Sequence, residues 1–503
     1  MNMSIDNQLA AIDLGSNSFR LSIGTIEQRD GISQIYSNDR LKETVRLASG
    51  LDEHNYLSEE AIERAINVLK LFGDRIEGFP ADRVRAVATN TFRVAKNVND
   101  FLPRAEAALG YPIEVISGQE EARLIFSGVV HELPPSDNKR LVIDIGGGST
   151  EFIIGKGLDP LIVKSLHMGC VSYTQRFFPG GQADETKFKQ AELAASKELE
   201  SIIKPYRKIM WDEVYGSSGT AKALVAVLQE CGFSDQGITL EGMEKLKKII
   251  LKHGVARVTD LSGLKDSRQE VLPAGLAIMM AIFKALKIER MNQGEGALRV
   301  GVLYDLIGRK TAVDKRNESV LQFMQRYHVS QHQAQRVKSL AEYFFDQIFH
   351  HDESKKELRQ MLSWAAQLHE IGISISQSSY HRHSAYIIEN ADMPGFSKSD
   401  QQLLSLIVLG HQGSLSKLKD ISLSGNKENI LLTIFCLRLA TLLMRKRRPI
   451  QQTIEVSVNH SDWTIRASKK WLSDHALTRY SLELESKAWK DLGIHLDIQK
   501  TSS

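Results

Sequence analysis

Two short segments of this sequence place a carboxylate two positions ahead of a glycine. They are AIDLGSNSFRLSIG, residues 11–24, and VIDIGGGSTEFIIG, residues 142–155. In each, an apolar strand ends at Asp13 or Asp144, and a turn of small residues leads into a second strand. Glycine allows successive N–H groups to point to one side, and such a nest binds phosphate oxygens. Taken singly, either segment could be an ordinary glycine-rich β-turn. Together, the two segments predict that both hairpins bind one phosphate-bearing ligand.

A carboxylate beside a phosphate repels it unless a cation stands between the two. Mg²⁺ suits this position because it is usually held by one or two carboxylates, water and phosphate oxygens. The twin segments therefore predict a magnesium-assisted phosphate site.

Three further segments carry residue types suited to phosphate chemistry, and each has a plain structural alternative. The turn Gly216–Thr220, GSSGT, opens a helix, whose N-terminus is a ready anion site. Arg93 follows a buried strand and has the fork geometry that clamps phosphate, or it is a surface arginine. Glu120 and Glu121 begin a helix. They either interact with its dipole or supply a base that orients or deprotonates a water.

The elements that position these residues alternate between strand and helix over the first 310 residues. Such alternation predicts an α/β architecture, and the repeated hairpin predicts that it is duplicated. A charged connector follows at residues 308–317, and the pattern is then helical to residue 443. After Pro449, alternating stretches predict a small antiparallel β unit with strands at residues 453–459, 463–468, 480–486 and 494–500.

The composition is that of a soluble globular protein, with 503 residues, 42% hydrophobic residues and a net charge of +3. Three dispersed cysteines exclude a disulfide framework and a cysteine-based zinc site, and they fit a reducing cytoplasm. The N-terminus lacks the basic and apolar regions of a signal peptide. We expect a cytoplasmic location. The basic cluster Arg445–Arg448 is either a solvated helix end or a weak peripheral contact with the inner face of the cell membrane.

The chain resembles the exopolyphosphatase and guanosine pentaphosphate phosphohydrolase (Ppx/GppA) family, within the actin, Hsp70 and sugar-kinase superfamily. The resemblance covers nearly the whole chain and rests on AIDLGSNSF, LSEEA, ISGQEEARLIF, LVIDIGGGSTE, MGCVSYTQRFFPGG, GSSGTAKA, GALRVGVLYDL, LHEIG and HRHSAYI. Two of these stretches, CVSYTQRFFPGG and HRHSAYI, favour its long exopolyphosphatase branch. The resemblance implies a homodimer of four-domain chains. The expected domains are two actin-like (ribonuclease H-like) ATPase domains, a helical HD-like domain and a small β-rich domain, at residues 1–125, 126–310, 318–445 and 446–503.

The resemblance also implies roles for particular residues. The catalytic glutamate falls on Glu121, with Glu120 as its neighbour, and a phosphate-binding arginine falls on Arg93. The Mg²⁺ carboxylates fall on Asp144 and Glu151. The expected phosphate-binding residues are Asp13, Gly15, Ser16, Asn17, Ser18, Gly146, Gly147, Gly148, Ser149, Gly216, Ser217, Ser218, Gly219 and Thr220.

The helical third departs from the HD pattern on which such metal sites depend. The His–Asp pair is His369–Glu370 here, and Gln333 stands at the early histidine position, one step from His332. His381, His383 and His411 remain. We therefore expect a scaffold that lines a channel or forms a dimer contact, rather than an active di-metal centre.

The activity implied is processive, Mg²⁺-dependent release of orthophosphate from the end of inorganic polyphosphate, with Glu121 acting on the in-line water. A basic channel for the polyanion is predicted at Lys197, Lys204, Arg207 and Lys208, and no nucleic-acid partner is expected. The alternative substrate is guanosine pentaphosphate (pppGpp), cleaved to ppGpp by the same residues. The sequence also leaves open an ATPase or sugar kinase, and a phosphate sensor without activity.

Overall fold

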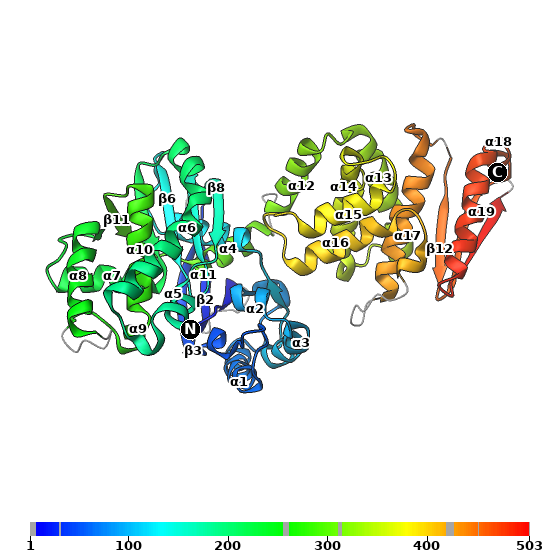
Figure 1. Ribbon diagram of the computed structural model, residues 1–503. Helices are drawn as coiled ribbons and strands as arrows, with labels where there is room; N and C mark the ends of the chain where they lie inside the picture. Colours follow the sequence, from blue (N-terminus) through cyan, green and yellow to red (C-terminus); the bar gives the residue numbers. More distant parts are fainter. Residues whose placement is uncertain are drawn as a thin grey trace. The chain divides into compact units, whose positions relative to one another are not determined.

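The computed structural model describes residues 7–29, 32–254, 261–309, 314–418, 427–450 and 452–501. The chain divides into two compact units, Met1–Asp314 and Lys315–Ser503 (Figure 1). The charged connector predicted at residues 308–317 coincides with this division, and residues 310–313 of it lie outside the described ranges. The four predicted domain boundaries remain predictions.

The first half of unit 1 is built on a five-stranded sheet in the order β3-β2-β1-β4-β5. The first three strands are antiparallel neighbours, and β1, β4 and β5 are parallel. The strands are β1 (Gln8–Leu14), β2 (Ser18–Arg29), β3 (Ile32–Thr44), β4 (Val84–Ala88) and β5 (Ile113–Val115).

The second half repeats this plan in a six-stranded sheet of order β10-β11-β9-β6-β7-β8. Again three antiparallel strands are followed by parallel ones, β9 and β11, and the edge strand β10 pairs antiparallel with β11. The predicted duplicated, actin-like α/β fold is confirmed. The strands are β6 (Lys139–Ile145), β7 (Thr150–Lys156), β8 (Asp159–Leu166), β9 (Glu213–Ser217), β10 (Ile238–Thr239) and β11 (Arg290–Gln293).

The helices of unit 1 cover these sheets, and two of them contact both halves. Helices α4 and α11 share a hydrophobic core with Ala11 of β1 and Val142 of β6. They can cross closely because Gly128 and Gly301 have no side chain: a Cβ at either position would collide with backbone atoms of the other helix or of the residue before it. The helices are α1 (Glu59–Arg75), α2 (Asn90–Val94), α3 (Val98–Leu109), α4 (Gly118–His131), α5 (Cys170–Phe177), α6 (Glu185–Ile209), α7 (Ser218–Glu230), α8 (Leu240–His253), α9 (Asp266–Gln269), α10 (Leu272–Leu286) and α11 (Leu298–Arg309).

Unit 2 is a helical bundle that ends in a three-stranded sheet with two more helices. One core runs through both parts, and Phe435, Trp463 and Trp489 pack together within it. The elements are α12 (Lys315–Arg326), α13 (Gln331–Phe349), α14 (Lys356–Leu368), α15 (Tyr380–Asn390), α16 (Lys398–Gly410), α17 (Lys427–Leu443), β12 (Glu455–Asn459), β13 (Asp462–Ser468), α18 (Lys469–Asp474), α19 (Ala476–Lys490) and β14 (His495–Thr501). No helix within the described ranges has the length and apolar character needed to cross a membrane.

The C-terminal region differs from its prediction in two ways. Residues 480–486, predicted as a strand, lie in helix α19, and β13 pairs with β14 in parallel rather than antiparallel fashion. The alternation in this segment was misleading because its leucines do not share an environment. Leu482 is fully buried together with Trp489, seven positions further on, whereas Leu484 is 45% exposed. A seven-residue spacing is two helical turns.

Candidate functional site

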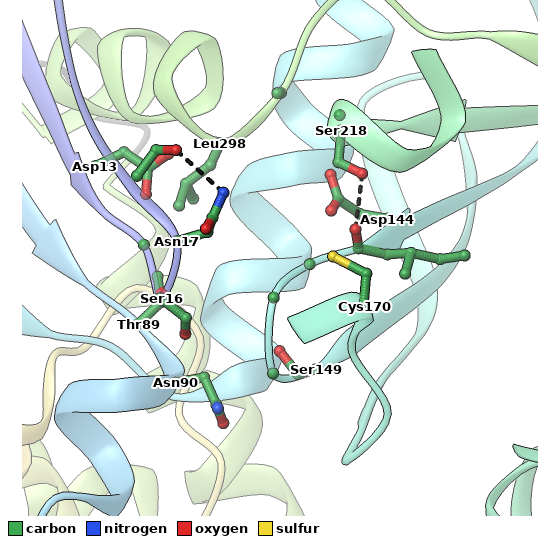
Figure 2. A pocket seen from close by; sticks show the side chains of 18 of the residues that line it. Asp13, Ser16, Asn17, Thr89, Asn90, Asp144, Ser149, Cys170, Ser218 and Leu298 are labelled. Atoms are coloured by element: carbon green, nitrogen blue, oxygen red, sulfur yellow. Dashed lines mark hydrogen bonds between the residues drawn. The ribbon is translucent and has the colours of Figure 1, made fainter. Parts of the chain in front are cut away.

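The two repeated hairpins open onto a single cleft in unit 1, with about 740 Å³ of empty space (Figure 2). The first half contributes Asp13, Gly15, Ser16, Asn17, Ser18, Arg20, Thr89 and Asn90. Helices α4 and α11, with the residue that precedes α11, contribute Glu121, Ile125, Ala297 and Leu298. The second half contributes Asp144, Ile145, Gly146, Gly147, Gly148, Ser149, Cys170, Ser218, Gly219 and Arg268. Residues far apart in the chain thus face one space.

The glycines of the second hairpin let the two loops come into contact. A Cβ on Gly147 would lie 3.1 Å from Cβ of Ser16, and a Cβ on Gly148 would collide with the amide of Asn90. The hydroxyl of Thr91 donates to Ser16 Oγ at 2.8 Å and fixes the first loop. Side chains at Gly147 and Gly148 would therefore prevent the close approach of the two loops.

The two hairpins differ in the residue opposite the aspartate. Asp13 pairs across the strands with Arg20, whereas Asp144 pairs with Glu151. Like charges directly opposite each other destabilise a sheet. Burial raises the pKa of Asp144 to about 6, and Glu121 adds to this rise. Burial, Glu121 and Asp144 raise the pKa of Glu151 well above its ordinary value.

This carboxylate pair is suited to a hard divalent cation. Asp144 lines the cleft, and Glu151 lies behind it, where its Oε1 accepts a hydrogen bond from Ser165 at 2.7 Å. Among the described residues there is no group of three or more His, Cys, Asp or Glu side chains that could hold a metal ion. A cation here would take its remaining ligands from water and phosphate, which is the usual arrangement for Mg²⁺.

Glu121 reaches the cleft from the first turn of α4. Ser117 caps this helix, since its hydroxyl accepts from the N–H of Glu120 at 3.1 Å. Glu121 Oε2 accepts a hydrogen bond from Arg93 Nη1 at 2.9 Å, and the same nitrogen donates to the carbonyl of Ile116. Burial raises the pKa of Glu121, and Arg93 opposes the rise. Arg93 therefore contacts the cleft through Glu121 and holds that carboxylate in place.

Glu120, predicted as a second catalytic residue, is not brought into the cleft. Its carboxylate is fully buried, forms a bidentate pair with Arg123 at 2.7 and 2.8 Å, and lies 3.8 Å from Arg85. Successive helical positions point about 100° apart, so neighbouring glutamates face different surroundings. Glu120 belongs to a buried ion-pair network and makes no contact with the cleft.

A cluster of cations at the cleft was missed by the sequence analysis. We use the name cation cluster for Arg20, Lys42, Lys265, Arg268 and Arg299. Arg20 and Arg268 line the cleft, and a Cβ on Gly219 would collide with the guanidinium of Arg268. Burial lowers the pKa of Lys42, and the other four cations lower it further, so each of them lies within electrostatic range of Lys42. The position of Arg20 just after the first loop is the one sequence signal for this cluster.

In the third turn of glycine and serine, residues 216–220, some residues line the cleft and others make hydrogen bonds to the backbone beside it. Ser218 and Gly219 line the cleft, and Ser218 Oγ donates to the carbonyl of Ile145 at 2.9 Å (Figure 2). Gly216, Ser217 and Thr220 do not line it; the hydroxyls of Ser217 and Thr220 donate to the carbonyls of Gly296 and Ile145.

The four residues predicted to form a polyphosphate channel lie on α6, and none of them lines the cleft. Lys197, Lys204 and Lys208 are on its surface, and Arg207 donates to the carbonyl of Ala285 at the end of α10. The structure does not bring these residues to the phosphate loops.

Four of the seven residues that the sequence analysis named in the helical region line one cavity of unit 2. Gln333, His369, Glu370 and His411 line it, whereas His332, His381 and His383 do not. Both lining imidazoles have Nδ1 within hydrogen-bond distance of a backbone carbonyl, and burial lowers the pKa of each. Arg447 pairs with Glu370 at 2.5 Å. The described part of unit 2, like that of unit 1, contains no three-residue group suited to a metal ion.

The duplicated halves and the cleft that they share define a protein of actin-like architecture. The model of the Ppx/GppA phosphatase family matches residues 25–310, and that of Ppx/GppA phosphatase domain III matches residues 315–486. The chain belongs to the Ppx/GppA phosphatase family.

Two relatives of similar length are both named guanosine-5'-triphosphate,3'-diphosphate pyrophosphatase. A guanosine-5'-triphosphate,3'-diphosphate pyrophosphatase of Vibrio cholerae serotype O1 is 37% identical over 505 residues, 99% of this chain and 100% of the relative. That of Pseudoalteromonas translucida is 38% identical over 492 residues, 97% of each chain.

Solved structures resemble part of the chain. An exopolyphosphatase from Cytophaga hutchinsonii aligns with a TM-score of 0.53 and 25% identity over 60% of this chain and 98% of its own. An Aquifex aeolicus member of the Ppx/GppA family aligns with a TM-score of 0.50 and 29% identity over 61% and 99%.

Proposed function

We propose that this protein hydrolyses the terminal 5'-phosphoanhydride of pppGpp, releasing orthophosphate and ppGpp. The observation that carries the hydrolysis is the cleft in which Glu121 faces phosphate loops from both halves. The choice of substrate is supported by full-length relatives named for guanosine-5'-triphosphate,3'-diphosphate. They favour this alternative over the polyphosphate substrate expected from the sequence.

Catalysis in this proposal rests on groups that are fixed before the substrate arrives. N–H groups of loop residues 15–18 and 147–149 would donate to the terminal phosphoryl oxygens, where charge is held in the transition state. Glu121 would accept the proton of the in-line water, a role worth roughly 10²–10⁴-fold. Burial favours this role because it raises the pKa of Glu121 and makes the carboxylate a stronger base.

Asp144 and Glu151 would hold the Mg²⁺ ion, which supplies the positive charge that lets phosphate approach a carboxylate. Their cross-strand pairing and raised pKa values support this assignment. The cation cluster would bind the anionic groups of the substrate beyond the terminal phosphate. In pppGpp these include the 3'-diphosphate, so the cluster also favours pppGpp over an ordinary triphosphate.

Inorganic polyphosphate is the second candidate. The cation cluster suits any chain of phosphates, and the Cytophaga hutchinsonii protein, named an exopolyphosphatase, resembles 60% of this chain in structure. The two candidates require the same chemistry and differ only in the group to which the terminal phosphate is attached.

The test is phosphate release from pppGpp and from polyphosphate of defined length, by wild type and Glu121→Gln, with Mg²⁺ or with EDTA. We expect faster release from pppGpp, dependence on Mg²⁺, and a loss of roughly 10²–10⁴-fold in kcat for the variant. The exposed Glu77→Gln is the matched control and should behave as wild type. Faster release from polyphosphate would favour the second candidate, and full activity of Glu121→Gln would remove Glu121 from the mechanism.

A further inference from the structure

A second cavity adjoins the cleft in unit 1, with about 1280 Å³ of empty space. It shares Ala297 with the cleft. Its lining includes Ser22 of β2, Tyr36 and Arg40 of β3, and Arg299 of α11, together with Lys222 and Glu295 from the second half.

A line of cations leads from the cleft into the second cavity. Arg20, in the cleft, and Ser22, in the cavity, are two positions apart on β2 and so share a face. Arg299 Nη1 donates to Ser22 Oγ at 3.0 Å. Burial and the neighbouring Arg20 and Arg40 lower the pKa of Arg299 to about 10, and Asp13 opposes this. Arg299 therefore lies within electrostatic range of Asp13 and Arg20 in the cleft and of Arg40 in the cavity.

Glu295 is one of two carboxylates that line the cavity, the other being Glu132. Its carboxylate lies 3.0 Å from Lys222 Nζ and accepts a hydrogen bond from Gln293 at 2.6 Å. The hydrogen bond from Lys222 lowers the pKa of Glu295, and Arg40 contributes to this. The side chain is therefore ionised at neutral pH. It is 66% exposed, so lone pairs remain free to accept further donors.

We infer that this cavity receives the nucleoside of a guanine nucleotide, with Glu295 accepting hydrogen bonds from the N1–H and the 2-amino group of the base. The inference rests on the proposed function, since the terminal phosphate of the same molecule would occupy the cleft. A carboxylate matches the adjacent donors of guanine, whereas adenine presents an unprotonated N1 that repels it. Tyr36 adds an aromatic ring of the kind that stacks on bases.

The experiment compares wild type, Glu295→Gln and the exposed control Glu289→Gln on three substrates: pppGpp, its adenosine counterpart pppApp, and inorganic tripolyphosphate. Wild type should prefer pppGpp to pppApp by about 10–100-fold in kcat/KM, the discrimination of a good bidentate contact. Glu295→Gln should lose this preference through a higher KM for pppGpp, with kcat nearly unchanged. Its rate on tripolyphosphate should equal that of wild type, because that substrate has no base, and Glu289→Gln should match wild type throughout.

The outcomes separate the two proposals. If wild type cleaves pppGpp and Glu295→Gln has the same KM and the same preference for guanine as wild type, Glu295 does not recognise the base and the inference is wrong. The proposed function still holds in that case. If Glu295→Gln slows all three substrates by one factor, Glu295 supports the cleft in general and the inference is wrong. If wild type releases phosphate from tripolyphosphate but not from pppGpp, the proposed function fails and the nucleoside site fails with it.

Discussion

Asp13 and Asp144 occupy equivalent positions in the repeated hairpins, yet only one of them has a cation opposite it. Arg20 lies across from Asp13 and Glu151 across from Asp144. Arg20 therefore offsets part of the effect of burial on the pKa of Asp13, whereas Asp144 faces a second carboxylate.

The burial of Asp144 leads to a prediction about stability. Its pKa is about 6 in the folded chain against 3.8 ordinarily. The folded state therefore binds the proton of Asp144 more tightly than the unfolded state does. As a result, the free energy of unfolding falls as pH rises from about 4 through 6. Without Mg²⁺ at pH 7.5, Asp144→Asn should be more stable than wild type by about 1–3 kcal/mol, since a unit of pKa is about 1.4 kcal/mol.

Urea denaturation in EDTA measures this difference, and the two proteins should converge near pH 4. Added Mg²⁺ should raise the Tm of wild type and leave that of Asp144→Asn unchanged. A variant that is less stable at pH 7.5, or one that still gains Tm from Mg²⁺, would contradict the assignment.

At the scale of elements, helices α4 and α11 are joined by buried ion pairs as well as by apolar packing. Asp305 of α11 accepts from Arg85 at 2.7 Å and from Arg123 at 2.5 Å, and Arg123 also holds Glu120. All of these side chains are at most 11% exposed. The network fixes the first turn of α4, from which Glu121 reaches the cleft.

Removing Asp305 should therefore make the chain unfold more easily. Asp305→Ala leaves two arginines buried without this partner, and we expect a loss of about 3–5 kcal/mol in the free energy of unfolding. Glu60→Ala breaks the exposed pair with Arg64 and should cost less than about 1 kcal/mol. Equal midpoints in urea for the two variants would show that the network does not stabilise α4 and α11.

At the scale of the whole molecule, the cleft and the adjoining cavity belong entirely to unit 1. The family models divide at the same place, between residues 310 and 315. The Cytophaga hutchinsonii protein, aligned over 98% of its length, covers only 60% of this chain. A chain of roughly the length of unit 1 thus exists as a protein of its own.

We predict that the fragment of residues 1–314 folds and releases phosphate from the substrate of the full chain. The reason is that it holds its own cores and every cleft residue. The measurement is a thermal melt with one cooperative transition, together with phosphate release by the fragment and by its Glu121→Gln variant. A fragment that melts without a transition would mean that unit 1 depends on unit 2 to fold.

The sequence by itself determined the duplicated halves and their hairpins. Strand alternation and the DLG and DIG turns are local patterns that depend on residues close together in the chain. The placement of Glu121 on the first turn of a helix followed from the same kind of signal. The failures at this level were also local: residues 480–486 alternate like a strand, but Leu482 and Trp489 bury one side of a helix.

Only the tertiary structure decided which side chains share the cleft. It placed Arg268 beside the loops and placed Glu120 in a buried ion pair with Arg123. It left the predicted channel residues, such as Lys197, on helix α6 away from the cleft. A side chain's neighbours depend on how helices and sheets distant in the chain pack together. Hydrophobic packing between the halves sets that arrangement, and no short stretch of sequence encodes it.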